Sequence, residues 1–284
     1  MTRFVNNLKT TFLLTLLFAV MLIIGGRLGG TGGLMIAFIF GGLMNIGAYF
    51  YSDKIALATM RGKEVDEQSA PDLYHMVQRL ANNANLPMPR VYICPQEAPN
   101  AFATGRNPKN AAVAVTNGAL KLLSYDELEG VMAHELAHVK NRDTLISCIV
   151  ATLAGVITMV AHMAQWALIF GGIGGQNRDS NIFADLAMII VAPIAAVLVQ
   201  MAVSRSREYV ADEDGARIAG TPFGLISALQ KLESVSQRVP MQGSSPSQSH
   251  MFIISPLLGK SLSGLFRTHP TTQDRVNKLR ALVD

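Results

Sequence analysis

Residues 134–138 read His-Glu-Leu-Ala-His, a spacing that can bind a metal ion. In a helix, His134 and His138 lie one turn apart on the same face, so their imidazoles can bind one ion. Glu135 lies one step round the helix, where its carboxylate can reach a water at the metal without being a ligand. The alternative is a surface helix with two solvated histidines. Because random placement would give this pattern in roughly 0.4% of such chains, we favour the metal site.

A catalytic zinc site usually has three protein ligands and one position for water, so the pattern predicts a third ligand elsewhere in the chain. Five residues have suitable chemistry, and each is separated from the two histidines by a different length of chain. They are Glu208, Asp212, Asp143, His162 and His269.

The apolar segments 145–170 and 182–203 help to choose among these residues. If the two segments form an antiparallel hairpin, residues at one height have a nearly constant sum of residue numbers. The midpoint between His134 and Glu208 is residue 171, which lies at the glycine-rich start of the predicted turn, so the rule pairs these two residues. By the same rule Asp212 pairs with His138 about residue 175.

The hairpin therefore predicts that Glu208 and Asp212 lie level with the two histidines. One carboxylate can bind the metal, and the other can orient a ligand histidine by accepting its second ring N–H. The alternative is that both carboxylates pair with nearby arginines on a solvated helix. These arginines are Arg205, Arg207 and Arg217.

The composition of the chain is that of a membrane protein. Of its 284 residues, 50% are hydrophobic and only 15% are charged, against about 25% charged in an average soluble protein. The net charge of +4 is modest, and no block of Lys and Arg is present, so nucleic-acid binding is not predicted. Four apolar segments approach the length of a bilayer span. They are residues 11–26, 33–50, 145–170 and 182–203.

The positive charges predict the orientation of these four spans. The short loops after the first and third segments contain one basic residue each, Arg27 and Arg178, out of 24 in the chain. The other basic residues lie in regions that four crossings place on one side, which the positive-inside rule makes cytoplasmic. The prediction is a multi-pass protein of the bacterial inner membrane in contact with the lipid bilayer. The alternative for segments 145–170 and 182–203 is a pair of buried core helices.

The parts between the spans predict a small catalytic domain. We expect a helix over 69–86 with Ser69 as its cap, strands at 89–95 and 111–116, and a helix that begins with a capping box of Ser124 and Glu127. Helices are also expected over most of 205–236 and at 269–283. We predict a mostly α protein with four transmembrane helices and a small antiparallel β-sheet. The predicted regions are an N-terminal hairpin (1–50), a cytoplasmic domain (51–144), a second hairpin (145–203) and a cytoplasmic helical region (204–284).

The two metal motifs together resemble those of a known family. "AHELAHVKNRDTL", a gap of membrane length and then "SRSREYVADEDGA" are similar to the HtpX family of bacterial membrane zinc proteases, as are "NAFATG" at 100–105 and "THP" at 268–270. That family is related to the CAAX prenyl endopeptidases. The resemblance implies a zincin-like (gluzincin) fold and one Zn²⁺ per chain, bound by His134, His138 and Glu208, with Glu135 as the catalytic base. It also implies cleavage of misfolded or damaged membrane proteins on the cytoplasmic side, as part of a stress response, with Asp212 left as the orienting residue.

The mechanism expected from these residues is attack by water on a peptide carbonyl. Glu135 takes a proton from the water and passes it to the leaving amine. The developing oxyanion needs a donor besides the metal, and we predict His269, with Arg205 as a weaker alternative. A histidine that merely caps the last helix is the other interpretation of His269. An extended substrate would pair with "NAFATG" and the strand at 111–116, unless these residues form an ordinary surface loop.

Three other functions are weighed. A prenyl-peptide endoprotease would use the same chemistry, but the resemblance implies more spans for that group than the four predicted here. An intramembrane protease would bury the motif in a span, whereas charged residues surround it in this chain. A non-catalytic zinc-containing adaptor would not need Glu135. The predicted substrates are therefore membrane proteins and unfolded polypeptides.

Overall fold

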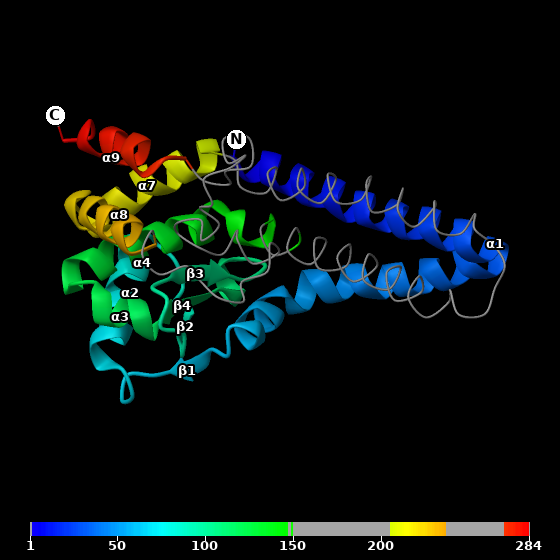
Figure 1. The fold of residues 1–284 in the computed structure, drawn as a ribbon, viewed down its shortest axis with the longest axis horizontal. Coiled ribbons are helices and arrows are strands. Elements are labelled where there is room, and N and C mark those ends of the chain that lie inside the picture. Colours follow the sequence, from blue (N-terminus) through cyan, green and yellow to red (C-terminus); the bar gives the residue numbers. More distant parts are fainter. Residues whose placement is uncertain (1, 147–148, 150–204, 237–269, 284) are drawn as a thin grey trace.

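The computed structural model describes residues 2–146, 149, 205–236 and 270–283. The predicted segments 145–170 and 182–203 lie almost wholly outside these residues, and so do His162 and His269. In the described part, a long helical hairpin extends from a domain in which helices are layered on a sheet (Figure 1). The helices are α1 (Thr2–Thr59), α2 (Pro71–Asn83), α3 (Asn117–Leu122), α4 (Tyr125–Asn141), α7 (Arg205–Ala219), α8 (Phe223–Ser236) and α9 (Thr272–Arg280), with a 3₁₀ turn at Pro108–Asn110. The strands are β1 (Lys63–Val65), β2 (Arg90–Cys94), β3 (Ala101–Thr104) and β4 (Ala112–Thr116).

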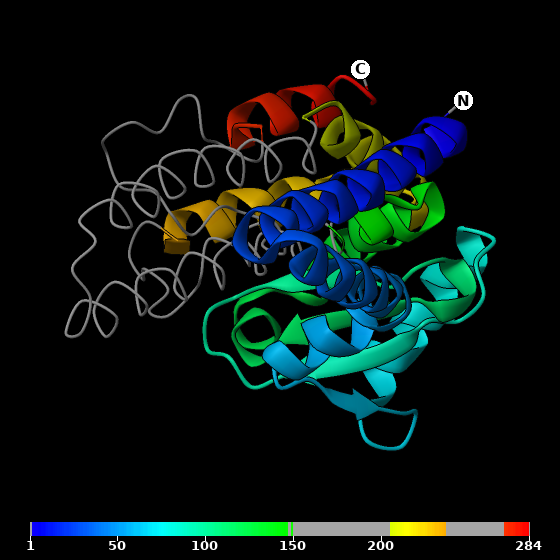
Figure 2. The ribbon, with the colours of Figure 1, turned by 90° about the vertical axis from the view of Figure 1, so that its right-hand side faces the viewer.

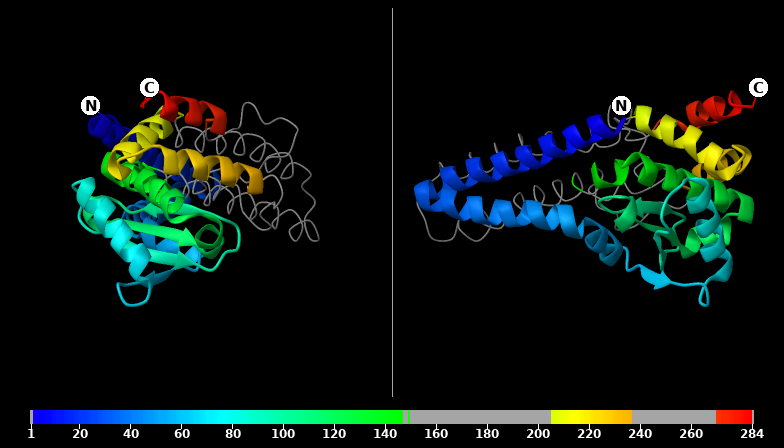
Figure 3. Two further views of the ribbon diagram at one scale, coloured as in Figure 1. Left: turned by 90° about the vertical axis from the view of Figure 1, so that its left-hand side faces the viewer. Right: turned by 180° about the vertical axis from the view of Figure 1, so that it is seen from behind.

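Helix α1 reverses direction, so that it forms two arms that meet at the end farthest from the sheet (Figures 1 and 3). Gly30 lies in the short loop predicted between the apolar segments 11–26 and 33–50, and its φ is positive, at 55°. The rings of Phe18 and Phe38 contact each other edge to face across the two arms, with centroids 5.5 Å apart. None of the helices in the described part of the chain combines the length and the hydropathy of a membrane span. The four transmembrane helices therefore stay a prediction.

The sheet is mixed, and the expectation of an antiparallel sheet was wrong. The strand order is β1-β2-β4-β3, and β2 pairs with β4 in parallel, with Val91 opposite Val113. The outer pairs, β1 with β2 and β3 with β4, are antiparallel. Residues 95–111 between β2 and β4 are long enough for a crossover connection, which lets β4 return alongside β2 in the same direction. Strand β3 forms within this crossover, so it becomes the edge of the sheet beside β4.

Each face of the sheet has its own apolar core. On one face, the last turns of α1 pack on the strands through a cluster that includes Leu57, Met60 and Phe102. On the other face, Val113 and Val115 belong to the larger core that includes residues of α2, α4, α7 and α8. Figure 2 shows this second side as layers, with α4 next to the sheet and α7, α8 and α9 farther out. The long helix α4 is thus held between the sheet and the C-terminal helices.

Two predicted helix starts had different outcomes. The capping box of α4 is confirmed, because the Ser124 hydroxyl accepts the Glu127 N–H and the Glu127 carboxylate accepts the Ser124 N–H. The prediction for Ser69 was wrong. Its hydroxyl donates to Asp66 Oδ1 at 2.7 Å, and the N-cap of α2 is Ala70, with no capping side chain. A local Asp-Ser turn competes successfully with the helix for the Ser69 hydroxyl.

Glu127 also connects α4 to α8. The carboxylate is 6% exposed, and it accepts hydrogen bonds from Lys231 Nζ at 2.5 Å and from the Ser227 hydroxyl at 2.6 Å. Burial by itself would raise the pKa of Glu127, but the hydrogen bonds from Lys231, Ser227 and the Ser124 N–H outweigh it. The pKa is lowered from its ordinary value of 4.5 to about 2. The ionised carboxylate is therefore part of what holds α8 on α4.

A lowered pKa of Glu127 makes the stability of the domain depend on acid. The ionised carboxylate contributes about 3 kcal/mol to the free energy of unfolding. This contribution is fully present above pH 4.5 and is lost as the pH falls towards 2. We expect the difference in unfolding free energy between wild type and Glu127→Gln to shrink over this range. Denaturant unfolding in detergent between pH 3 and 7 measures it. Glu97→Gln, which removes an exposed ion pair with Lys121, is the control, and equal acid sensitivity of wild type and Glu127→Gln would contradict the prediction.

Candidate metal centre

The site is built where α7 crosses α4. Gly215 of α7 lies directly against the backbone of His134, and a Cβ on this glycine would come within 2.9 Å of the His134 Cα. Only glycine allows this approach. Glu208 and Asp212 precede Gly215 on the same helix, and both are buried. The close contact therefore brings the carboxylates of α7 to the histidines of α4.

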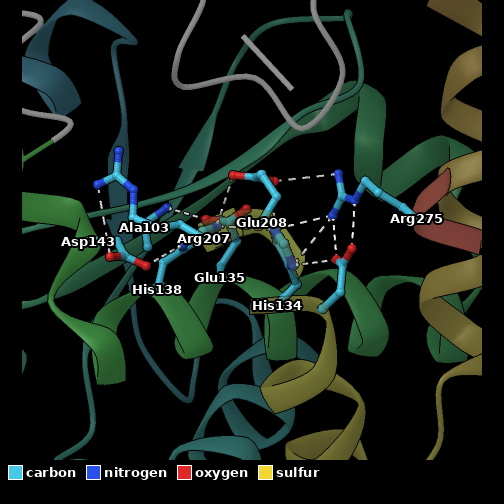
Figure 4. A network of polar contacts seen from close by, with 9 residues as sticks. Ala103, His134, Glu135, His138, Asp143, Arg207, Glu208 and Arg275 are labelled. Atoms are coloured by element: carbon cyan, nitrogen blue, oxygen red, sulfur yellow. Dashed lines mark hydrogen bonds and ion pairs between the residues drawn. The ribbon is translucent and has the colours of Figure 1, made fainter. Parts of the chain in front are cut away.

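His134, His138 and Glu208 converge on one point (Figure 4). Each offers one ligand atom, and the three atoms lie within 4.8 Å of one another. The two Nε2 atoms are 3.2 Å apart. His134 Nε2 lies 3.7 Å from Glu208 Oε2, and His138 Nε2 lies 3.6 Å from Glu208 Oε1. The structure thus brings together the three residues for which the sequence predicted the metal-ligand role, and the role itself stays a prediction.

The second nitrogen of each histidine faces a carboxylate. Asp212 Oδ1 is 3.0 Å from His134 Nδ1, and Asp143 Oδ2 is 3.2 Å from His138 Nδ1. With the proton on Nδ1, each ring donates to its carboxylate and keeps the Nε2 lone pair directed at the centre. The sequence had suggested Asp212 for this position, whereas it suggested Asp143 only as a metal ligand. The orienting position of Asp143 was therefore missed.

Arg275 of α9 is a second residue that the sequence reasoning missed. Its side chain is almost fully buried, and it donates to Asp212 from Nε at 2.9 Å and from Nη2 at 2.6 Å. Nη1 lies 3.6 Å from Glu208 Oε2. A signal was present, because Thr272, Arg275, Val276 and Leu279 are spaced as one helical face. An arginine on an otherwise buried face predicts a buried partner of opposite charge.

The contacts change the protonation of the groups behind the histidines. Burial would raise the pKa of Asp212, but the charge of Arg275 and the contact with His134 lower it to about 2. Burial would likewise lower the pKa of His138, but the hydrogen bond to Asp143 and the charge of Glu208 raise it to about 9. The raised pKa of His138 shows that the carboxylates around it favour positive charge at the centre, and the lowered pKa of Asp212 keeps that carboxylate ionised.

The buried charges of the centre fit a divalent cation. Two guanidinium groups, Arg207 and Arg275, face four carboxylates. When both histidines are deprotonated, as metal ligands must be, two negative charges are left uncompensated. The carboxylates are those of Glu135, Asp143, Glu208 and Asp212, all of them buried. Uncompensated buried charge is costly, so a cation of charge +2 matches what the residues lack. Two imidazole nitrogens with one carboxylate oxygen are a donor set that suits zinc.

Glu135 lies between the centre and the edge of the sheet. Its Oε2 accepts the backbone N–H of Ala103 in β3 at 2.8 Å. Burial raises the pKa of the Glu135 carboxyl, although the nearby histidines oppose this. A carboxyl with a raised pKa suits proton transfer near neutral pH. His269 lies outside the described residues, and the side chain of Arg205 is outside the described part as well.

Comparison with known proteins gives consistent matches over most of the chain. The profile of the family described as Peptidase family M48 matches residues 67–283. A "Protease HtpX homolog" of Desulforapulum autotrophicum is 53% identical over 97% of this chain and 89% of that protein. Another, of Syntrophobacter fumaroxidans, is 51% identical over 98% of this chain and 99% of that protein. A solved structure, "Crystal Structure of S. mikatae Ste24p", is similar in fold alone, with 16% identity and a TM-score of 0.53 over 97% of this chain and 66% of that one.

The geometry predicts that Glu208 is required for metal binding. We expect Glu208→Ala to lose its metal, because two imidazoles alone leave the coordination incomplete. Metal analysis of the purified protein measures this directly. Zinc at 100 times its dissociation constant should also stabilise the wild type by about 2.7 kcal/mol and the variant not at all. Glu213→Ala is the matched control on the same helix, since Glu213 pairs with Arg217 away from the centre, and equal zinc content in wild type and Glu208→Ala would refute the prediction.

Proposed function

The chain belongs to peptidase family M48 and is a metalloprotease, and we propose that it is a membrane-bound zinc endopeptidase. The observation that carries this proposal is the convergence of His134, His138 and Glu208 beside the carboxylate of Glu135. A structural zinc site would not need a buried carboxylate of raised pKa next to its ligands. The arrangement matches the three ligands and one base of a zinc hydrolase.

In the proposed mechanism, His134, His138 and Glu208 hold the zinc ion. When bound, zinc supplies a Lewis acid that makes water nucleophilic near neutral pH and polarises the scissile carbonyl. Asp212 and Asp143 keep the two imidazoles in the orientation and tautomer that this requires. Arg275 holds Asp212 in place through two hydrogen bonds.

Glu135 acts as the general base and then as the general acid. It takes a proton from the attacking water and gives it to the leaving amine. The hydrogen bond from the Ala103 N–H holds the Glu135 carboxylate between β3 and the rings of the two histidines. The proposal for the oxyanion donor remains His269. It is supported by the sequence position of His269, three residues before α9, the helix that carries Arg275 into the centre.

Strand β3 is proposed to bind the substrate. An extended peptide can pair only with a strand that has a free edge, and β3 lies at the edge of the sheet whereas β4 is paired on both sides. The sequence predicted that the substrate pairs with both "NAFATG" and the strand at 111–116, and β3 alone is now proposed. Pairing through the main chain demands little of the substrate side chains. It therefore suits a protease that cleaves misfolded or damaged polypeptides of varied sequence.

Attachment to the membrane is supported by the surface of α1. Large apolar side chains are exposed along both arms, including Ile23, Ile36, Leu43 and Phe50, with exposed fractions of 45% to 64%. So many exposed large apolar side chains on one helix are costly in water and favour contact with lipid or another apolar partner. We propose hairpins at 1–50 and 145–203 in the bacterial inner membrane. The regions 51–144 and 204–284 then form the cytoplasmic catalytic unit.

The role of Glu135 is tested with Glu135→Gln. We expect this variant to keep its zinc and to lose cleavage by at least about 100-fold, because the amide cannot accept the proton. Zinc content and cleavage of a denatured membrane protein and of a soluble protein are measured for both proteins. Cleavage by the variant at the wild-type rate, or cleavage by neither protein, would contradict the proposed function. A narrow consensus in a peptide-library profile would contradict the proposed main-chain binding.

The topology is tested by cysteine accessibility in a background without Cys94 and Cys148. A single cysteine placed within 171–181 should react with a membrane-impermeant maleimide from outside the inner membrane, because that loop follows an odd number of crossings. The control is Lys63→Cys on the exposed strand β1, which should react only after the membrane is opened. Protection of both positions until the membrane is opened would show that segments 145–170 and 182–203 do not cross the bilayer, and the reverse pattern would show the opposite orientation.

A further inference from the structure

Arg207 is a buried charged residue that the mechanism above leaves without a role. It lies on α7 immediately before Glu208, and only 7% of it is exposed. A guanidinium group stays charged in proteins, and burying one is costly unless an opposite charge lies near. Burial lowers the pKa of Arg207, while the charges of Asp143 and Glu208 oppose that shift. Its surroundings are therefore the carboxylates of the centre.

One ion-pair partner of Arg207 is the carboxylate that faces His138. Arg207 Nη1 lies 4.0 Å from Asp143 Oδ1, while the other oxygen, Asp143 Oδ2, is 3.2 Å from His138 Nδ1 (Figure 4). One carboxylate thus connects a guanidinium group on α7 with a histidine on α4. The order of groups is arginine, carboxylate, imidazole.

The same order of groups occurs behind His134, where Arg275 contacts Asp212 and Asp212 contacts the imidazole. The two sides differ in how the carboxylate is held. Asp212 lies within the regular helix α7, whereas Asp143 follows the end of α4. Arg142, between α4 and Asp143, has a left-handed backbone with φ of 60°. Residues 143–146 are helical again, so Asp143 lies at the start of a new helical stretch, directly after this break in the chain.

We propose that Arg207 is a positioning residue for the metal centre, which holds the Asp143 carboxylate against His138 and so orients that ligand. The inference rests on the proposed function, because it requires that His138 binds zinc. It extends that function by giving each histidine its own carboxylate and its own buried arginine. It also assigns different tasks to two adjacent residues of α7, since Glu208 binds the metal and Arg207 orients another ligand of it.

The test is a double-mutant cycle with zinc affinity as the readout, measured by competition with a chromophoric chelator. We expect Asp143→Asn to weaken zinc binding by about 10- to 100-fold, as is usual for groups that orient a ligand, and Arg207→Gln by up to about tenfold. Because Arg207 acts through Asp143, the double variant should bind zinc no more weakly than Asp143→Asn alone. Arg217→Gln, which alters an exposed arginine of the same helix, should bind zinc like the wild type.

A second readout reports the ligand geometry. The visible spectrum of the cobalt-substituted protein should change in Arg207→Gln and Asp143→Asn, and the double variant should resemble Asp143→Asn. Arg207→Lys keeps the positive charge but not the reach of the guanidinium group. It should fold even if Arg207→Gln does not. It should weaken zinc binding in the wild-type background and have no further effect in the Asp143→Asn background.

Several results would overturn the inference. These are wild-type zinc affinity in Arg207→Lys and Arg207→Gln, an unchanged cobalt spectrum, or effects of Arg207 and Asp143 that multiply in the double variant. If the wild type binds zinc and the variants bind it equally well, Arg207 has no positioning role and the proposed function stands. Wild-type protein that binds no zinc would instead remove the proposed function, and the two failures are therefore distinct.

Discussion

The close packing of α7 on α4 is the contact on which the centre depends. It is set by Gly215, whose missing side chain lets α7 rest on the backbone of His134. With the two helices at this distance, Glu208 reaches the Nε2 atoms of both histidines, and Asp212 reaches His134 Nδ1. A larger residue at position 215 would separate the helices and pull both carboxylates away together.

Compensation of buried charge explains the rest of the centre. A carboxylate without a partner is strongly destabilising in a protein interior, and the helices bring four of them to one place. Two arginines from different helices, Arg207 and Arg275, reduce the excess of negative charge. The remaining negative charge favours a divalent cation there. The carboxylates that carry this negative charge include those that orient the histidines, Asp143 and Asp212.

The catalytic domain and the α1 hairpin are joined at the sheet. Arg90 Nη2 lies 2.6 Å from Asp53 Oδ2, and the Gln96 amide donates to the Met60 carbonyl at 2.9 Å, so polar contacts tie the end of α1 to β2 and the loop after it. Phe102 of β3 packs into the same cluster as Leu57. The strand proposed to bind the substrate therefore has the hairpin on one side and the base Glu135 on the other.

Local patterns in the sequence determined the helix that carries His134 and His138, because helical spacing and the Ser124 capping box depend only on neighbouring residues. The sequence also indicated Glu208 and Asp212, through the hairpin assumed for segments 145–170 and 182–203 and through their spacing of one turn on one helix. Only the tertiary structure decided that β2 and β4 are parallel and that β3 is the edge strand, because strand pairing joins residues distant in the chain. The positions of Asp143, Arg207 and Arg275 were decided in the same way. Each is an ordinary charged residue in its local sequence and acquires its place only when α4, α7 and α9 pack together.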